Sequence, residues 1–242
     1  MNKEEFCSYI DYSATAQNKT RDMLEKRCRE TIEYGFSSFG SYSGDVAFIK
    51  SIVGDKAKII CPVSFPMGAS TTSSKIYEAL EGIDNGANEL DVMMNISWFK
   101  SGLYDEVLDE LKQIVEAAKK KLSDCTVKVI IETPQLKDRN ELAKACELVI
   151  ASGADFIKQA SGYANGDGDN GEMIEPSQNV GVDNLRAMQE IVKGRIKIKA
   201  SGEPKDLDEC LYYIQELGVS RIGNEEIPKW LDEVGEDYWK DK

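Results

Sequence analysis

Apolar residues recur every three or four positions in six segments of the chain, a spacing that places them on one face of an α-helix. A glycine follows most of these segments, as at Gly35, Gly86 and Gly153. Glycine often ends a helix because it adopts the left-handed backbone conformation without strain. The first helix begins near Thr20. The pattern predicts helices over 24–32, 76–83, 107–118, 142–149, 185–191 and 207–217.

Short apolar runs alternate with these helices and read as strands. They cover 10–12, 37–40, 59–63, 89–94, 127–132, 156–160, 196–200 and 221–223. Strands that alternate with helices form βαβ units and a parallel sheet. Eight strands and at least six helices predict a (β/α)8 TIM barrel in one domain over residues 1–242. A doubly wound open sheet is the alternative, but no strand is followed by the G-x-G-x-x-G pattern of dinucleotide-binding folds.

A repeated spacing supports the barrel. In four places, the fifth residue after a helix-ending glycine falls at a strand, and these residues are Gly40, Asp91, Lys158 and Gly223. Loops of equal length would place these residues at similar heights in the barrel. We therefore expect Asp91 and Lys158 to share an interior layer near the C-terminal ends of the strands, where TIM-barrel active sites lie. Chance spacing is the alternative.

Composition excludes several classes of function. The 242 residues carry a net charge of −13, which argues against nucleic acid or an anionic membrane as a partner. The absence of histidine removes Ser-His-Asp and Cys-His catalysis and the usual imidazole ligands of zinc. The six cysteines form no C-x-x-C pair, so we expect reduced core residues. With no signal peptide and no long apolar run, a cytoplasmic protein is expected.

Two lysines at strand ends carry the candidate chemistry. Lys158 follows Phe156 and Ile157, and Lys199 closes a similar strand. Burial and a neighbouring cation both lower the pKa of an amine, which makes it nucleophilic near neutral pH. Asp91 could pair with Lys199 or transfer protons. The trio suits imine chemistry, and a buried salt-bridge network without catalysis is the alternative.

Ordered motifs across most of the chain resemble the deoxyribose-phosphate aldolase family, the class I aldolases that join acetaldehyde to glyceraldehyde 3-phosphate. The matching stretches run from Ile10-Asp11 to Gly223 and include 33–36, 65–72, 89–95, 128–133, 153–158 and 199–202. The resemblance implies a TIM barrel with Lys158 as the Schiff-base lysine, Lys199 as its activating partner and Asp91 as the proton-transfer carboxylate. It implies no cofactor and no metal ion, and a role in carbohydrate catabolism. It leaves open whether the chain forms a homo-oligomer.

Three stretches depart from the family pattern. Where the family has Thr-Ser-Thr-Gly after the Schiff-base lysine, this chain has Gln159-Ala160-Ser161-Gly162. Where the family has Gly-Gly amides that hold the substrate phosphate, it has Gly202-Glu203-Pro204. Where the family ends its last strand in Gly-x-Ser, it has Gly223-Asn224-Glu225-Glu226.

These departures affect the expected substrate. Proline donates no N–H, and three glutamates would cluster where a phosphate dianion should sit. We therefore expect an aldehyde or sugar-like substrate without the usual phosphate, neutral or cationic. An ordinary deoxyribose-phosphate aldolase and a non-catalytic barrel that binds a carbonyl compound are the alternatives. The expected substrate-binding residues are Asp11, Gln159, Gly162, Gly202, Glu203, Gly223, Asn224 and Glu225.

Two further segments stand outside the repeating pattern. An apparent insertion near 163–178 would lie on the catalytic face, as an active-site lid or a surface loop; its Asp/Asn/Gly spacing lacks the full calcium-loop pattern. The acidic tail near 226–242 is expected to pack as a helix. Within this tail, Tyr238 loosely resembles the C-terminal tyrosine of the family.

Overall fold

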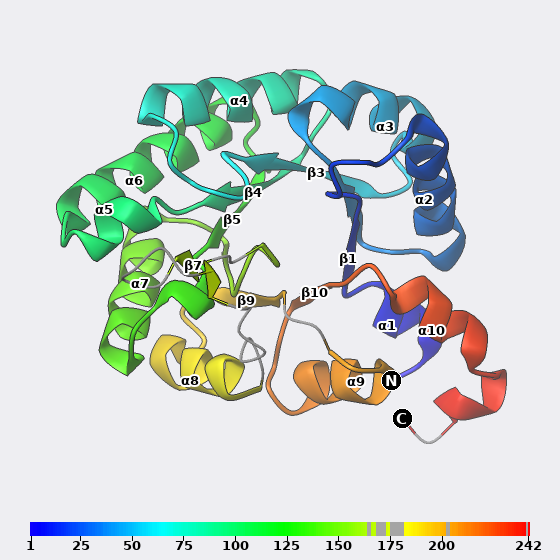
Figure 1. Ribbon diagram of the computed structural model, residues 1–242. Coiled ribbons are helices and arrows are strands. Elements are labelled where there is room, and N and C mark those ends of the chain that lie inside the picture. The colour runs from blue at the N-terminus through cyan, green and yellow to red at the C-terminus, as the bar shows by residue number, and fades with distance from the viewer. Residues whose placement is uncertain (164–165, 168–172, 175–181, 202–203, 241) are drawn as a thin grey trace.

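In the described part of the chain, eight parallel strands close into a barrel with the helices outside (Figure 1). This computed structural model describes residues 1–163, 166–167, 173–174, 182–201, 204–240 and 242. The barrel strands are β1 (Ile10–Ser13), β2 (Ser38–Gly40), β3 (Lys58–Val63), β4 (Glu89–Met93), β5 (Thr126–Ile130), β6 (Phe156–Lys158), β9 (Lys197–Ala200) and β10 (Arg221–Gly223). Each strand pairs with its neighbours in chain order, and β10 pairs with β1. The predicted TIM barrel is confirmed.

A helix follows each barrel strand and packs on the outside of the sheet. These helices are α2 (Arg21–Tyr34), α3 (Val46–Val53), α4 (Thr72–Asp84), α6 (Tyr104–Lys121), α7 (Arg139–Ser152), α8 (Val182–Val192), α9 (Leu207–Gln215) and α10 (Ile227–Glu233). The predicted boundaries of α2 are confirmed: Thr20 Oγ1 accepts from the Met23 amide at 3.2 Å, and Gly35 ends the helix with φ of 70°.

Three short helices carry too few turns to show a periodic pattern, and the sequence did not predict them. They are α1 (Lys3–Cys7), α3, and α5 (Ile96–Lys100). Of these, α3 completes the ring by connecting β2 to β3, and it buries Val46, Ile49 and Val53. Its position follows from the fold, because consecutive parallel strands need a crossover on the outer face.

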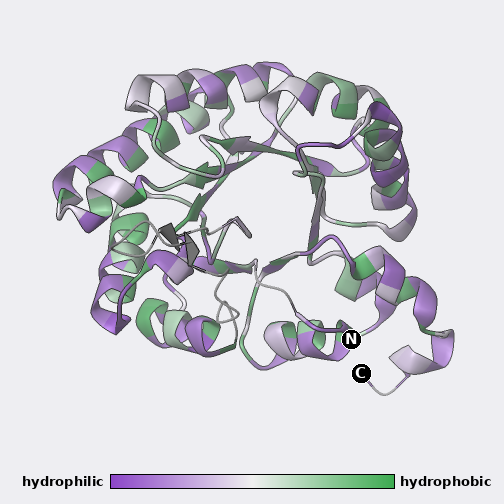
Figure 2. Ribbon diagram, viewed as in Figure 1, coloured by the Kyte–Doolittle hydropathy of each residue, from purple (hydrophilic) through white to green (hydrophobic). Residues whose placement is uncertain are grey.

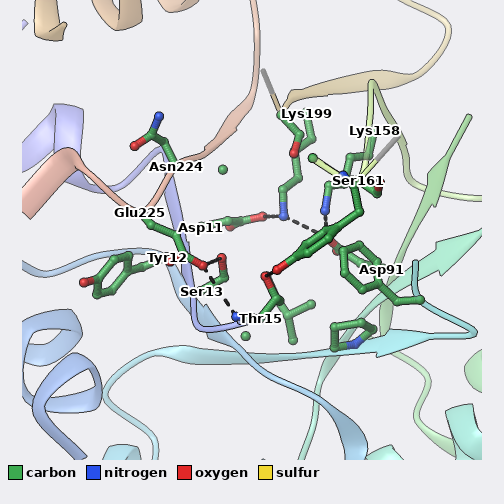
Figure 3. Close-up of a pocket in the computed structure, with 18 of the residues that line it drawn as sticks. Asp11, Tyr12, Ser13, Thr15, Asp91, Lys158, Ser161, Lys199, Asn224 and Glu225 are labelled. Carbon is green, nitrogen blue, oxygen red and sulfur yellow. Dashed lines mark hydrogen bonds and ion pairs between the residues drawn. The ribbon is translucent and has the colours of Figure 1, made fainter. Parts of the chain in front are cut away.

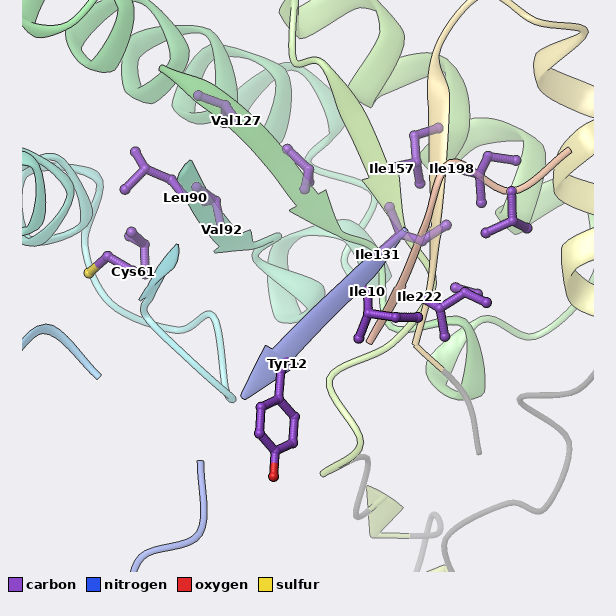
Figure 4. Close-up of a cluster of buried hydrophobic side chains, with 14 of the residues drawn as sticks. Ile10, Tyr12, Cys61, Leu90, Val92, Val127, Ile131, Ile157, Ile198 and Ile222 are labelled. Atoms are coloured by element: carbon purple, nitrogen blue, oxygen red, sulfur yellow. The ribbon is translucent and has the colours of Figure 1, made fainter. Parts of the chain in front are cut away.

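The alternation of side chains along each strand divides the interior into two regions. Outward residues such as Ile10, Leu90, Val127 and Ile222 form the apolar core between sheet and helices (Figure 4). The outer surfaces of the helices are hydrophilic (Figure 2). Inward residues face the barrel axis, and many of them are charged. The polar interior is therefore a property of one face of the sheet, while the opposite face supplies the apolar core.

The chain ends pack together beside the barrel. The tail forms α10 and a 3-10 turn, η3 (Glu236–Trp239), and the Trp239 ring lies 5.4 Å from that of Phe6. The Tyr238 hydroxyl donates to Asp208 at 2.9 Å. Tyr238 is thus held on the outside of the barrel, against the first turn of α9, and its loose likeness to the C-terminal tyrosine of the family stays a sequence-based expectation.

The insertion near 163–178 lies mostly outside the described residues. Its described part includes two short strands, β7 (Gly166–Asp167) and β8 (Met173–Ile174), which pair antiparallel. The choice between lid and surface loop therefore stays a sequence-based expectation. All six cysteines are described, and they are buried and free. No helix among the described residues is long and apolar enough to cross a membrane.

A buried ion pair links two outer helices to the barrel. Lys75 on α4 and Glu110 on α6 are 0% and 1% exposed, and their charged groups lie 2.6 Å apart. Lys75 also donates to the carbonyl of Met93 at 2.9 Å, which anchors both helices at the end of β4. Burial lowers the pKa of Lys75, and the partner carboxylate opposes this shift.

We expect Lys75→Met to lower the free energy of unfolding by about 3–5 kcal/mol, because it leaves the Glu110 carboxylate buried without its counter-charge. The double variant Lys75→Met/Glu110→Leu should regain most of this loss, because it removes both charges. Urea unfolding followed by circular dichroism measures both. A double variant as unstable as the single one would show that the pair is not the origin of the loss.

Candidate active site

The carboxyl ends of the strands surround a cavity of about 260 Å³. Figure 3 shows Lys158, Lys199 and Asp91 close together at one side of it, with Glu225, Ser13 and Thr15 at the other. The cavity opens at the end of the barrel where TIM-barrel active sites lie. Its size suits a molecule of a few carbon atoms rather than a large ligand.

Lys158 is the last residue of β6, and its side chain points into the cavity. It is 8% exposed, and its Nζ lies 2.9 Å from Asp91 Oδ2. Burial lowers the pKa of this amine, and the Lys199 charge lowers it further, while Asp91 opposes both effects. The Phe65 ring centroid lies 5.6 Å from the same nitrogen. Lys158 is therefore a buried amine that loses its proton more readily than a lysine in water.

Lys199 and Lys158 share a single carboxylate oxygen. The Lys199 Nζ also lies 2.9 Å from Asp91 Oδ2, and it lies 2.7 Å from Asp11 Oδ2. The two lysines are register partners on adjacent strands. Burial favours the protonated acid of Asp91, but the neighbouring lysines, Lys158 and Lys199 foremost, outweigh burial and hold its pKa well below the usual range. The expected layer that joins Asp91 to Lys158 is present.

A third lysine completes the network, and sequence reasoning missed it. Lys128 Nζ lies 3.2 Å from Asp11 and 3.4 Å from Asp91, and it is ion-paired to Glu89. These acids raise the pKa of Lys128 against the effect of burial. Strand alternation places Lys128 on the same face as Ile130, and the register of β5 and β6 sets Ile130 beside Lys158. This register comes from the tertiary structure, so alternation alone did not reveal the role of Lys128.

Asp11 anchors the opposite wall of this network. Its Oδ1 accepts from Ser38 Oγ at 2.7 Å and lies 3.3 Å from Arg221 Nε. Burial alone would raise the pKa of Asp11, but the adjacent ammonium groups hold it well below its usual range. Among the described residues, this network thus joins the acids Asp11, Glu89 and Asp91 to the cations Lys128, Lys158, Lys199 and the partly exposed Arg221.

The expected substrate-binding residues fall into three groups. Gly162, Gly223, Asn224 and Glu225 line the cavity, as Asp11 does. The side chain of Gln159 is fully buried and is not among the lining residues that the structure describes. The remaining two, Gly202 and Glu203, lie outside the described residues.

Of the three glutamates expected to cluster, Glu203 lies outside the described residues, and the other two differ in position. Glu225 lines the cavity, but its Oε2 lies 2.6 Å from Nη1 of Arg27 on α2. Glu226 has an exposed side chain and turns toward Lys229, 4.0 Å away. Arg27 lies nearly two hundred residues before Glu225 in the chain, so only the closed barrel brings this counter-charge to the site.

Aromatic residues close one side of the cavity mouth. The Tyr163 hydroxyl lies 3.2 Å from Thr15 Oγ1, and the Tyr163 ring meets that of Phe65 edge-on at 5.6 Å. The segment before Tyr163 is held by Glu132, whose buried carboxylate accepts from the Ser161 amide at 3.1 Å. Glu132 has a φ of 49°, a conformation that side chains rarely adopt. Its strained backbone directs this carboxylate under the loop that follows Lys158.

Comparison with known proteins decides what kind of barrel this is. Residues 9–218 match the family described as DeoC/LacD family aldolase. The chain belongs to this aldolase family. The deoxyribose-phosphate aldolase of Carboxydothermus hydrogenoformans is 35% identical over 232 residues, covering 95% of this chain and 96% of that protein. That of Thermoanaerobacter pseudethanolicus is 36% identical over 215 residues, covering 88% and 90%.

A solved structure agrees with this assignment. The aldolase QR15 superposes with a TM-score of 0.81 at 33% identity, covering 95% of each chain. The protein is thus a class I aldolase, a lyase, and the alternative of a non-catalytic barrel is wrong. The resemblance seen in the ordered sequence motifs is confirmed over most of the chain.

In this aldolase the protonation state of Lys158 should depend on the nearby Lys199. Lys199→Leu should raise the pKa of Lys158, because it removes a nearby cation and leaves Asp91 to stabilise the ammonium form. Since only the neutral amine reacts, its reactivity should then appear at higher pH. Reductive methylation of the Lys158 peptide, followed by mass spectrometry across pH, measures this shift.

Lys197→Leu is the matched control, since it makes the same change on the same strand. Lys197 is exposed at the opposite end of β9 and lines a separate cavity. We expect it to leave the methylation profile of Lys158 in place. If the profile also stayed in place in folded Lys199→Leu protein, Lys199 would not control the amine.

Proposed function

We propose that this protein catalyses reversible aldol cleavage through an imine on Lys158. The observation that carries this proposal is a buried amine that shares one carboxylate oxygen with a second ammonium group at the cavity wall. An amine in this setting is a nucleophile near neutral pH. The family of the chain supports the same class of reaction.

The reaction follows from this geometry. The neutral Lys158 amine attacks the substrate carbonyl, and loss of water gives an iminium ion. The bond between the α- and β-carbons then breaks: its electron pair forms the double bond of an enamine as the iminium nitrogen accepts electrons, and the β-hydroxyl proton passes to a base as one aldehyde leaves. The enamine takes up a proton at carbon, and water hydrolyses the imine to release the second aldehyde and restore the amine.

Asp91 and Lys199 are the proposed proton-handling groups. Asp91 Oδ2 lies 2.9 Å from both amines, so it can accept a proton beside the reacting nitrogen. Lys199 supplies an ammonium that keeps Lys158 neutral and can return a proton. We propose that Asp11 acts through Lys199, as a positioning residue, because it holds the Lys199 ammonium at 2.7 Å.

We further propose that the aldehyde released from the far end of the cavity carries no phosphate. TIM barrels often bind phosphate in the loops after the seventh and eighth strands, here β9 and β10. In this chain the loop after β10 places the Glu225 carboxylate in the cavity, and Pro204 after β9 has no amide hydrogen to donate. The names of the relatives favour the other candidate, cleavage of 2-deoxyribose 5-phosphate.

We also propose that the barrel is the whole functional unit of residues 1–242 and that it assembles into a homo-oligomer. The deoxyribose-phosphate aldolase of Aeropyrum pernix, 24% identical to this chain, is described as tetrameric.

Incubation with acetaldehyde and borohydride should add the mass of a reduced imine to a single peptide, the one that contains Lys158. Lys158→Ala should abolish the adduct and the cleavage activity, because no other amine occupies the same position. The matched variant Lys197→Ala should keep both. Labelling that persists in folded Lys158→Ala protein, or is absent in the parent, would remove the imine mechanism.

A further inference from the structure

The far end of the active-site cavity holds an ion pair that the proposed reaction does not use. Glu225 follows β10 and lines the cavity, and its Oε2 lies 2.6 Å from Arg27 Nη1. The same guanidinium nitrogen donates to the carbonyl of Ser13 at 2.5 Å. Arg27 is not among the lining residues in the described part of the chain. Glu225 therefore stands between a positive charge and the cavity.

The pair leaves little net charge at this end of the cavity. The side chains of Arg27 and Glu225 are 20% and 34% exposed, so water screens them incompletely. A guanidinium stays protonated in proteins. The carboxylate of Glu225 further favours the charged form of Arg27, which raises its pKa against the effect of burial. Because both groups are ionised, each cancels the field of the other.

Neutral hydrogen-bonding groups surround the pair. Glu225 Oε1 accepts from Ser13 Oγ at 3.4 Å and from the Thr15 amide at 3.5 Å. These long bonds leave the donors and the carboxylate oxygen able to bind a ligand hydroxyl. Figure 3 shows Glu225, Ser13 and Thr15 grouped on one side of the cavity, with Asn224 nearby. Such a wall offers both donors and acceptors but no free charge.

We propose that Glu225 determines specificity, by masking Arg27, and that the substrate carries a neutral hydroxyl group at this end. This inference rests on the proposed aldol reaction and specifies its substrate. A phosphate group at this end would be repelled by the Glu225 carboxylate. An ammonium group would gain little from that carboxylate, because it is already paired with Arg27. The cationic substrate expected from the sequence is thereby disfavoured, and a hydroxyaldehyde fits.

Removing Glu225 or Arg27 singly should change the substrate preference in opposite directions. Glu225→Ser uncovers a guanidinium one layer behind the cavity wall, so it should create a preference for a phosphorylated substrate. Arg27→Met leaves an unpaired carboxylate in the cavity, so it should create a preference for an amine. Glu225→Gln keeps an acceptor for Arg27 and removes only the charge. It therefore tests the same idea with the least change in shape.

The experiment compares kcat/KM for three substrates that differ only at carbon 5: 2-deoxyribose, its 5-phosphate, and its 5-amino-5-deoxy analogue. The parent enzyme should favour 2-deoxyribose over both charged forms. Glu225→Ser and Glu225→Gln should raise the phosphate-to-neutral ratio by about tenfold or more, the usual worth of one charge-assisted hydrogen bond. Arg27→Met should lower this ratio and raise the amine-to-neutral ratio. Arg27→Met/Glu225→Gln should show no preference for either charge.

Imine trapping on the parent enzyme separates the two proposals. If acetaldehyde and borohydride fail to label Lys158 in the parent, the aldol mechanism is wrong. If the label forms but the parent cleaves the phosphate ester as well as the neutral sugar, the inference about Glu225 is overturned. Unchanged charge ratios in folded Glu225→Gln protein would overturn it as well, even if Arg27→Met did not fold.

Discussion

One carboxylate oxygen, Oδ2 of Asp91, organises the active site of this aldolase. It lies 2.9 Å from the amines of both Lys158 and Lys199, on strands far from β4 in the sequence. A buried amine close to a cation loses its proton easily, and a buried carboxylate between amines keeps its charge. The shared oxygen thus holds the two amines side by side at the cavity wall, where burial and Lys199 lower the pKa of Lys158 and Asp91 opposes this shift.

The barrel offsets the free-energy cost of burying these charges. Charges removed from water are costly unless they are paired and hydrogen-bonded. Buried charges of opposite sign are paired in the interior: Lys128 contacts Asp11 and Asp91 and is ion-paired to Glu89. Meanwhile the outward positions of the same strands build the apolar core against the helices (Figure 4). Because the two sets alternate along each strand, the polar site and the stabilising core are built from different residues of the same strands.

The two ends of the cavity differ in how their charges are arranged. At the Lys158 end, burial and the neighbouring Lys199 lower the pKa of Lys158, and Asp91 opposes this shift. The motifs that resemble the family meet at this end. At the far end, Arg27 and Glu225 are paired, and Glu225 belongs to a stretch that departs from the family pattern. We propose that the substrate is selected at this second end.

Much of this protein was determined by its sequence alone, because the relevant signals are local. Apolar periodicity and glycine stops predicted the long helices, and the spacing after these glycines placed Asp91 and Lys158 in one layer. Short segments such as α3 were missed because eight residues show too little periodicity. Only the tertiary structure decided how charges are paired. The pairing of Arg27 with Glu225 and the place of Lys128 depend on barrel closure and register, which no local pattern encodes. Charge interactions act through space at a few ångströms, so their outcome is set by the fold rather than by neighbours in the chain.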